Sequence, residues 1–434
     1  MTAPQIPNLF KVPELKEKIL FTLLCLVVYR VGAHVATPGV NVQALTDFMA
    51  TQSGTLFNFY DLFAGGAFSR ATVFALGIMP YISASIVFQL AGPVFPVIEK
   101  MQRDEEGRKK LTQWTRYLTV LLCMFQAFGF AKFTEQLPGA VASPGLGFQL
   151  QTMLTLTTGG VFIMWLGEQI TERGIGNGMS LMIFFSIIER ILPETLRTFE
   201  ALRAGTLTVP VLVVVLAVMV LVVAGTVAVT VAARRIPIQI PRKVMGRGRV
   251  REGQKTFIPL RLNTANVMPI IFAQSLIIVP GTLATFSSIQ FLKDAAELFN
   301  TTSWVYVVTM TLLIVFFAYF YTSIIFNPVD LAENLKKQGG FIPGVKPGAA
   351  TADYIDDVLS RITLPGALFL AAVAMLPIIV SNVLNMPFGF GGTALLICVG
   401  VGLDTVQQVQ QHLLLRHYDG FMKEGRVKFR GRNQ

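Results

Sequence analysis

The sequence predicts an all-α polytopic membrane protein with ten spans. Its 434 residues are 53% hydrophobic and 14% charged, with a mean hydropathy of +0.59, whereas soluble domains carry about 25% charged residues. Ten apolar stretches approach the roughly 20 residues that cross a bilayer. They lie at 19–36, 71–95, 111–131, 149–167, 179–196, 207–233, 264–289, 303–326, 363–384 and 391–411.

The cations gather on one side of this arrangement. An even number of spans places both termini on the same side, and that side then holds 28 of the 36 Lys and Arg residues. Short cytoplasmic loops are enriched in these residues. We therefore expect both termini in the cytoplasm. No small-residue cleavage site follows the first span, so we expect that span to be retained.

A short apolar stretch precedes the second span. Residues 56–68 are too few to cross a bilayer, contain Gly65 and Gly66, and end before Ser69 and Arg70. Non-spanning backbone is tolerated at membrane depth where it lines a cavity. The stretch therefore predicts an apolar half-helix that does not span the membrane.

Two cytoplasmic loops are longer than connection requires. Residues 234–262 carry nine cations and one acid, Glu252, with interleaved Ile, Pro and Gly. This composition predicts a structured hairpin finger that docks a polyanion or an acidic protein surface; topology control and headgroup contact are the alternative.

Residues 327–362 contain two amphipathic helical pieces around a turn. Gly339 and Gly344 have phosphate-loop spacing, but Val345 replaces the required Lys, which excludes a nucleotide site.

Catalytic and ion-coupling motifs are missing from the sequence. It has no HExxH zinc motif, no Ser/His/Asp set in usable order and no paired acids in mid-span. Ion-coupled transporters and proton pumps usually need intramembrane carboxylates or unwound polar helices. We therefore expect no enzyme, no metal and no cofactor. A secondary transporter for a small solute remains the rival interpretation, and an intramembrane protease is a third.

Five sequence blocks, spread in order over essentially the whole chain, are distinctive. They are GIMPYISASIVFQL at 77–90, MWLGEQITERGIGNGMS at 164–180, GQKTFIPLRLNTANVMPIIFA at 253–273, FNPVDLAENLKKQGGFIPGVKPG at 326–348 and GGTALLICVGVGLDTVQQVQ at 391–410. Together these blocks resemble the bacterial SecY family of protein-conducting channels.

The resemblance implies two inverted five-helix halves around an hourglass pore. The halves would be residues 1–190 and 207–434, joined by an outer hinge at 191–206, with a lateral gate between spans 2–3 and 7–8. The implied function is to translocate unfolded secretory preproteins across the bacterial cytoplasmic (inner) membrane and to release transmembrane segments sideways. Such a channel performs no chemistry itself.

The resemblance also implies roles for individual residues. An apolar ring would block ions by dewetting yet let any sequence slide through; Met179 departs there from the usual branched residue. The ring comprises Ile82, Ile86, Met179, Ile183, Ile271 and Ile397. The 56–69 stretch would be a plug, a half-helix in the outer funnel of the pore with glycine joints; a re-entrant packing helix without a gating role is the alternative. The plug comprises Leu56, Phe57, Phe59, Leu62, Phe63, Gly65, Gly66 and Phe68. The lateral gate comprises Ser85, Ile86, Phe88 and Gln89 against Phe272, Gln274, Ser275 and Ile278, and its polar groups are expected to hydrogen-bond when idle.

The two cytoplasmic loops acquire partners through the same resemblance. They would dock the ribosome, through ribosomal RNA, and the SecA ATPase, while SecE and SecG are small companion subunits. Preprotein signal sequences and membrane lipids would meet the gate. Lys346 stands where the family usually has Arg, so the charge is kept but the planar fork is lost. The docking cations are Arg242, Lys243, Arg247, Arg249, Arg251 and Lys346.

Overall fold

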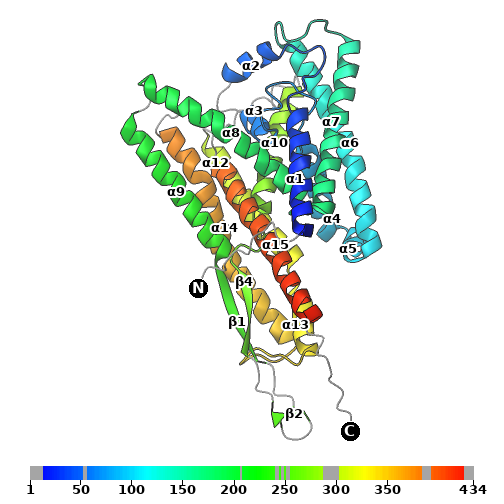
Figure 1. Ribbon diagram of the computed structural model, residues 1–434, viewed down its shortest axis with the longest axis vertical. Helices are drawn as coiled ribbons and strands as arrows, with labels where there is room; N and C mark the ends of the chain where they lie inside the picture. Colours follow the sequence, from blue (N-terminus) through cyan, green and yellow to red (C-terminus); the bar gives the residue numbers. More distant parts are fainter. Residues whose placement is uncertain are drawn as a thin grey trace.

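The fold is a bundle of long helices with a β-hairpin at one end (Figure 1). The computed structural model describes residues 13–51, 56–205, 208–239, 244–245, 249–250, 255–286, 303–383 and 392–424. The helices are α1 Pro13–Gly32, α2 Val42–Thr51, α3 Leu56–Phe63, α4 Met79–Val94, α5 Pro96–Arg103, α6 Glu105–Gln136, α7 Leu146–Arg173, α8 Gly178–Arg203, α9 Val209–Val231, α10 Met268–Phe286, α12 Trp304–Ile325, α13 Pro328–Lys337, α14 Ala349–Val383 and α15 Gly392–Glu424. The strands are β1 Ala233–Gln239, β2 Val244–Met245, β3 Arg249–Val250 and β4 Lys255–Arg261.

Each expected span overlaps one helix. Among the described residues, five stretches are long and apolar enough to cross a membrane: α6, α7, α9, α12 with α13, and α14. The α4–α5 pair makes a sixth if its two bent parts are counted as one span. The most apolar window of α9 is 11% buried inside the protein and that of α14 is 56% buried, so α9 is peripheral and α14 is internal (Figure 1).

The second span is shorter than expected. We expected a helix from residue 71, but α4 begins at Met79 and the preceding residues form successive turns. Gly65, Gly66 and Gly77 have φ of 64°, 75° and 56°. These left-handed conformations suit glycine and interrupt a helix. At its other end α4 stops at Val94, and α5 continues at a bend of 109°.

The expected outer hinge is mostly helical. Helix α8 runs through it to Arg203, and Gly205 follows with φ of 72°. The expected joint between the halves is therefore confined, in the described residues, to the short turn before α9. The hinge role and the division into two halves stay predictions.

The two long loops form one structural unit. Strands β1 and β4 pair antiparallel, with Ala233 opposite Arg261 and Gln239 opposite Lys255. Gln239 also exchanges backbone hydrogen bonds of 2.9 and 3.0 Å with Phe341 of the second loop. The hairpin packs on α13 and the start of α14, and the small core between them contains Ile236, Ile238, Leu260, Leu335, Ile355 and Leu359. The expected hairpin finger and both amphipathic helical pieces are confirmed.

Candidate pore, gate and plug

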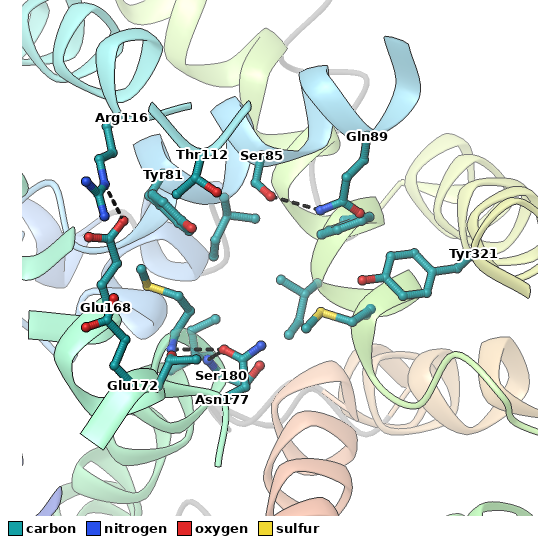
Figure 2. A pocket seen from close by; sticks show the side chains of 17 residues that line it. Tyr81, Ser85, Gln89, Thr112, Arg116, Glu168, Glu172, Asn177, Ser180 and Tyr321 are labelled. Atoms are coloured by element: carbon teal, nitrogen blue, oxygen red, sulfur yellow. Dashed lines mark hydrogen bonds and ion pairs between the residues drawn. The ribbon is translucent and has the colours of Figure 1, made fainter. Parts of the chain in front are cut away.

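A cavity of about 320 Å³ lies between six helices of the bundle (Figure 2). Side chains from α4, α6, α7, α8, α10 and α12 line it. Its apolar wall includes four of the expected ring residues, while its polar wall includes Tyr81, Ser85, Gln89, Thr112, Arg116, Glu168, Glu172, Asn177 and Ser180. The four ring residues are Ile82, Met179, Ile183 and Ile271.

The other two expected ring residues lie elsewhere in the core. Ile86 and Ile397 are buried, with 5% and 0% of their surface exposed, and belong to the same large hydrophobic cluster as Ile82. Neither is among the residues that line the cavity. Residues four apart share one helix face, so Ile82 and Ile86 lie on the same side of α4 at different depths.

The start of α8 is positioned by a local cap. The Asn177 side chain accepts hydrogen bonds from the backbone N–H groups of Met179 and Ser180, at 3.1 and 3.3 Å. Such a cap satisfies donors that the first helical turn leaves free. A Cβ on Gly178 would stand 2.0 Å from the carbonyl oxygen of Gly167, so only glycine permits this close turn from α7 into α8.

We call the contact between α4 and α10 the α4–α10 seam. Aromatic gate residues pack against neighbouring helices on both sides of it. Phe88 on α4 packs against Trp114 on α6, with ring centroids 6.2 Å apart. Phe272 on α10 packs edge-on against Phe317 and Tyr321 of α12, at 5.7 and 5.5 Å. These contacts join α4 to α6 and α10 to α12, so each side of the seam is braced internally.

The hydrogen bonds of the gate differ from the expectation. Gln89 Nε2 donates to Ser85 Oγ at 2.8 Å, and Ser275 Oγ donates to the Ile271 carbonyl at 2.7 Å. Buried Gln274 lies beside the hydroxyl of Tyr306 on α12. The side-chain hydrogen bonds of Ser85, Gln89 and Ser275 described above are therefore made within α4 or within α10, and they do not cross the seam.

A charged pair at the cavity wall was missed from the sequence. Arg116 Nε on α6 donates to Glu168 Oε1 on α7 at 2.8 Å, and Glu172 lies one turn further along α7 (Figure 2). Each is a charge inside or beside an apolar run, and that was the available signal. Hydropathy cannot say which two such charges meet.

The predicted plug is buried where the structure describes its side chains. Leu62, Phe63 and Phe68 are 3%, 1% and 7% exposed. The Tyr60 hydroxyl donates to the Leu76 carbonyl at 2.8 Å, which ties α3 to the turns before α4. The side chains of Leu56, Phe57 and Phe59 lie outside the described residues, although their backbone belongs to α3.

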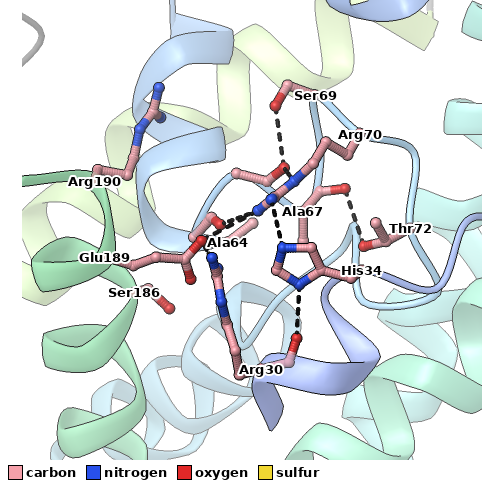
Figure 3. A network of polar contacts seen from close by, with 12 residues as sticks. Arg30, His34, Ala64, Ala67, Ser69, Arg70, Thr72, Ser186, Glu189 and Arg190 are labelled. Carbon is pink, nitrogen blue, oxygen red and sulfur yellow. Dashed lines mark hydrogen bonds and ion pairs between the residues drawn. The ribbon is translucent and has the colours of Figure 1, made fainter. Parts of the chain in front are cut away.

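A network of charges surrounds the predicted plug (Figure 3). Asp61 on α3 pairs with Arg190 on α8 at 3.2 Å, and Glu189 on α8 pairs with Arg70 at 3.2 Å and with Arg30 on α1. Burial lowers the pKa of the Arg70 guanidinium, and the nearby Asp61 carboxylate opposes that shift. Asp61, an acid inside an apolar half-helix, was the signal that sequence reasoning missed.

The docking cations are only partly described. The side chain of Arg249 and the residues Arg242, Lys243, Arg247 and Arg251 lie outside the described parts. Lys346 is exposed at the turn before α14, and its carbonyl accepts a hydrogen bond from Thr351 Oγ1 at 2.8 Å. The backbone at this position is therefore held while the cation faces outward.

Comparison with known proteins decides the family. The SecY family profile matches residues 72–406. This chain belongs to the SecY family. A protein translocase subunit SecY of Aquifex aeolicus is 43% identical over 96% of this chain and 98% of its own length. The predicted family is confirmed.

Two solved SecY-type structures share the fold. One, described as showing that the SecY plug domain stabilises the closed state of the translocation channel and maintains a membrane seal, has a TM-score of 0.66 at 19% identity over 98% of this chain and all of that one. Sec61 in a canine ribosome–channel complex has a TM-score of 0.62 at 18% identity, with the same coverage. This SecY-family protein is a helical, multi-span, protein-conducting translocation channel without catalytic activity, as the sequence predicted.

Proposed function

We propose that a translocating polypeptide passes through the cavity between α4, α8 and α10, with Ile82, Met179, Ile183 and Ile271 as its narrow apolar ring. The observation that carries this proposal is that one cavity collects ring residues from three helices far apart in sequence. An apolar constriction sheds water and so blocks ions. It also offers no fixed hydrogen bonds that would favour one passing sequence over another.

Lateral release follows from the seam beside that cavity. Ser85 and Gln89 of α4 and Phe272 of α10 line the cavity, and α4 and α10 are in contact with each other. Each side is braced internally by aromatic contacts, and the recorded hydrogen bonds of its polar residues do not cross it. Separation along the seam therefore breaks little polar bonding. An apolar segment in the cavity could leave into lipid there.

The 56–69 segment acts as the plug in this proposal. Its buried apolar side chains and its charged contacts with α1 and α8 hold it against the bundle. The solved SecY structure whose plug domain stabilises the closed state supports the same role here. The segment lies at the opposite end of the bundle from the β1–β4 hairpin (Figure 1), which would be the outer end if the hairpin faces the cytoplasm of a bacterial cell.

The joined loop unit of β1, β4, α13 and the start of α14 is the proposed docking surface. The ribosome is one partner, because a solved relative is part of a ribosome–channel complex. SecA is the second, with SecE and SecG as companion subunits. Lys346 and the cations of residues 234–262 supply positive charge for ribosomal RNA or an acidic protein face.

Site-specific photo-cross-linking tests the polypeptide path. A photo-reactive residue at Ile82 faces the cavity, whereas one at Val213, 59% exposed on peripheral α9, is the matched control. With SecA, ATP and an arrested preprotein in reconstituted vesicles, we expect an adduct at Ile82 and none at Val213. Translocation without an adduct at Ile82 would place the path elsewhere. A saturable small-solute site in the cavity would instead favour the transporter.

A further inference from the structure

One face of α8 connects the cavity to the predicted plug. Met179 and Ile183 line the cavity, while Ser186 lies against Gly65 and Arg190 pairs with Asp61 in the plug region. The spacing of four, three and four residues places all four side chains on one side of the helix. Met179 and Arg190 are separated by about 16 Å along α8. A displacement of the cavity wall is therefore carried along a single rigid element to the plug.

The contacts at the far end of that face fasten the plug to α8. Arg190 pairs with Asp61, which is 4% exposed and also accepts the Ser69 backbone N–H at 2.9 Å. A Cβ on Gly65 would meet Ser186 Oγ at 3.2 Å. The α8 backbone therefore comes directly against the turn after α3.

Arg70 connects Glu189 of α8 to the turns that follow α3 (Figure 3). The Nε of Arg70 donates to the Gly66 carbonyl, and Nη2 of Arg70 donates to both the Gly65 carbonyl and Glu189 Oε1. Nη1 of Arg70 lies 3.0 Å from His34 Nε2. A guanidinium only donates, so the histidine nitrogen accepts. The side chain of Arg70 thus links the plug turns to α8 and to His34, two residues past the end of α1.

The same carboxylate of Glu189 also pairs with Arg30 of α1. Glu189 therefore holds two cations from two different segments at once. Removing it would leave both guanidinium groups close together without that counter-charge. Charge-assisted hydrogen bonds of this kind are about twice as strong as neutral ones, so this contact holds the plug turns more firmly than a neutral hydrogen bond would.

We infer that Glu189 is a positioning residue which holds the plug closed through Arg70, and that α8 transmits polypeptide occupancy of the cavity to this latch. The inference rests on the proposed polypeptide path and adds the element that couples it to the plug. Coupling is reciprocal. A polypeptide in the cavity weakens the contact between Glu189 and Arg70. If that contact is already broken, the polypeptide causes a smaller additional opening of the plug.

Ion leakage from vesicles that contain the complete translocase with this chain tests the inference. The variants are Glu189→Gln, Arg70→Gln and the pair together. Glu135→Gln is the matched control, because Glu135 is also 14% exposed and also pairs with a cation, Lys132, away from the plug. We expect each latch variant to raise idle chloride leakage about tenfold. Glu135→Gln should leave it at the wild-type value.

Non-additivity separates a latch from general damage. If Glu189 acts through Arg70, the double variant leaks no more than either single variant. An arrested preprotein should then increase leakage less in Glu189→Gln than in the wild type. Arg70→Lys, which keeps the charge but loses the fork, serves if Glu189→Gln does not assemble, and it too should leak. Glu189→Asp should restore much of the seal.

Wild-type leakage in every assembled latch variant would overturn the inference, as would fully additive effects. The Ile82 adduct, measured in the same vesicles, keeps the two proposals distinct. An adduct without altered leakage refutes the latch and leaves the polypeptide path intact. Loss of the adduct in the wild-type chain refutes the path itself.

Discussion

Arg116 and Glu168 lie 52 residues apart in sequence, yet the Arg116 Nε donates to Glu168 Oε1 at 2.8 Å across the α6–α7 contact. The side chains are 42% and 13% exposed. Glu168 is therefore the more enclosed partner, and the pair fixes one wall of the cavity (Figure 2).

Removing one partner of this pair should cost more than removing both. We expect Glu168→Gln to lower the thermal unfolding midpoint, at a cost of about 1 kcal/mol, because Arg116 keeps its charge and loses its counter-charge. The double variant with Arg116→Gln should be closer to wild type, since no lone charge remains. Unfolding of the purified protein in detergent measures both. A loss in the double variant equal to the sum of the losses from Glu168→Gln and Arg116→Gln alone would contradict a direct pairing.

A glycine on α7 allows the turns before α4 to pack closely. A Cβ at Gly159 would stand 2.0 Å from the Val73 carbonyl oxygen, and a backbone atom cannot swing away. We expect Gly159→Ala to destabilise the protein by about 1–3 kcal/mol, measured as a lower unfolding midpoint. Gly147→Ala is the control on the same helix, because its Cβ would meet nothing within 4 Å. It should be neutral or slightly stabilising; an equal loss there would point to backbone effects instead.

The cap of α8 offers a milder test of the cavity wall. Asn177→Ala removes the acceptor for the N–H groups of Met179 and Ser180 and should cost about 1 kcal/mol. Asn177→Ser keeps a capping oxygen and should recover most of that loss. Unfolding midpoints of the two variants give the comparison. The cap explanation fails if serine is as destabilising as alanine.

The exposed turn before α14 predicts a charge-dependent docking defect. Lys346→Glu should weaken binding of ribosomes to reconstituted vesicles about fivefold at low salt, with a smaller difference at high salt. The backbone of the turn should persist, because Thr351 binds the Lys346 carbonyl rather than its side chain. Lys132→Glu, near the other end of the bundle, makes the same charge change as a control. Equal binding by both variants would exclude Lys346 from the docking surface.

Replacement by arginine asks whether the fork matters at this position. Lys346→Arg introduces the residue expected here from the sequence resemblance, and tighter binding would indicate a planar, two-pronged contact. Unchanged affinity would mean that a point charge is sufficient there. A sedimentation assay of vesicles with ribosomes distinguishes the two results.

Much of the architecture was predictable because it depends on local composition. Ten apolar runs each coincide with a helix, and the basic loop forms the expected hairpin, since hydropathy and turn residues act over a few neighbouring positions. The sequence resemblance also placed Ile82, Met179, Ile183 and Ile271, which line one cavity. The predicted start of the second helix was wrong, because the left-handed conformations of Ala71 and Gly77 are not visible as a loss of hydropathy.

The sequence by itself determined the class of protein, the number and position of its apolar segments and the concentration of its cations. Only the tertiary structure decided that Asp61 meets Arg190, that Glu189 serves both Arg30 and Arg70, and that Gln239 joins Phe341. The physical reason is range. Helix formation and membrane burial depend mainly on nearby residues, whereas the pairing of distant charges depends on how whole helices cross and rotate when they pack.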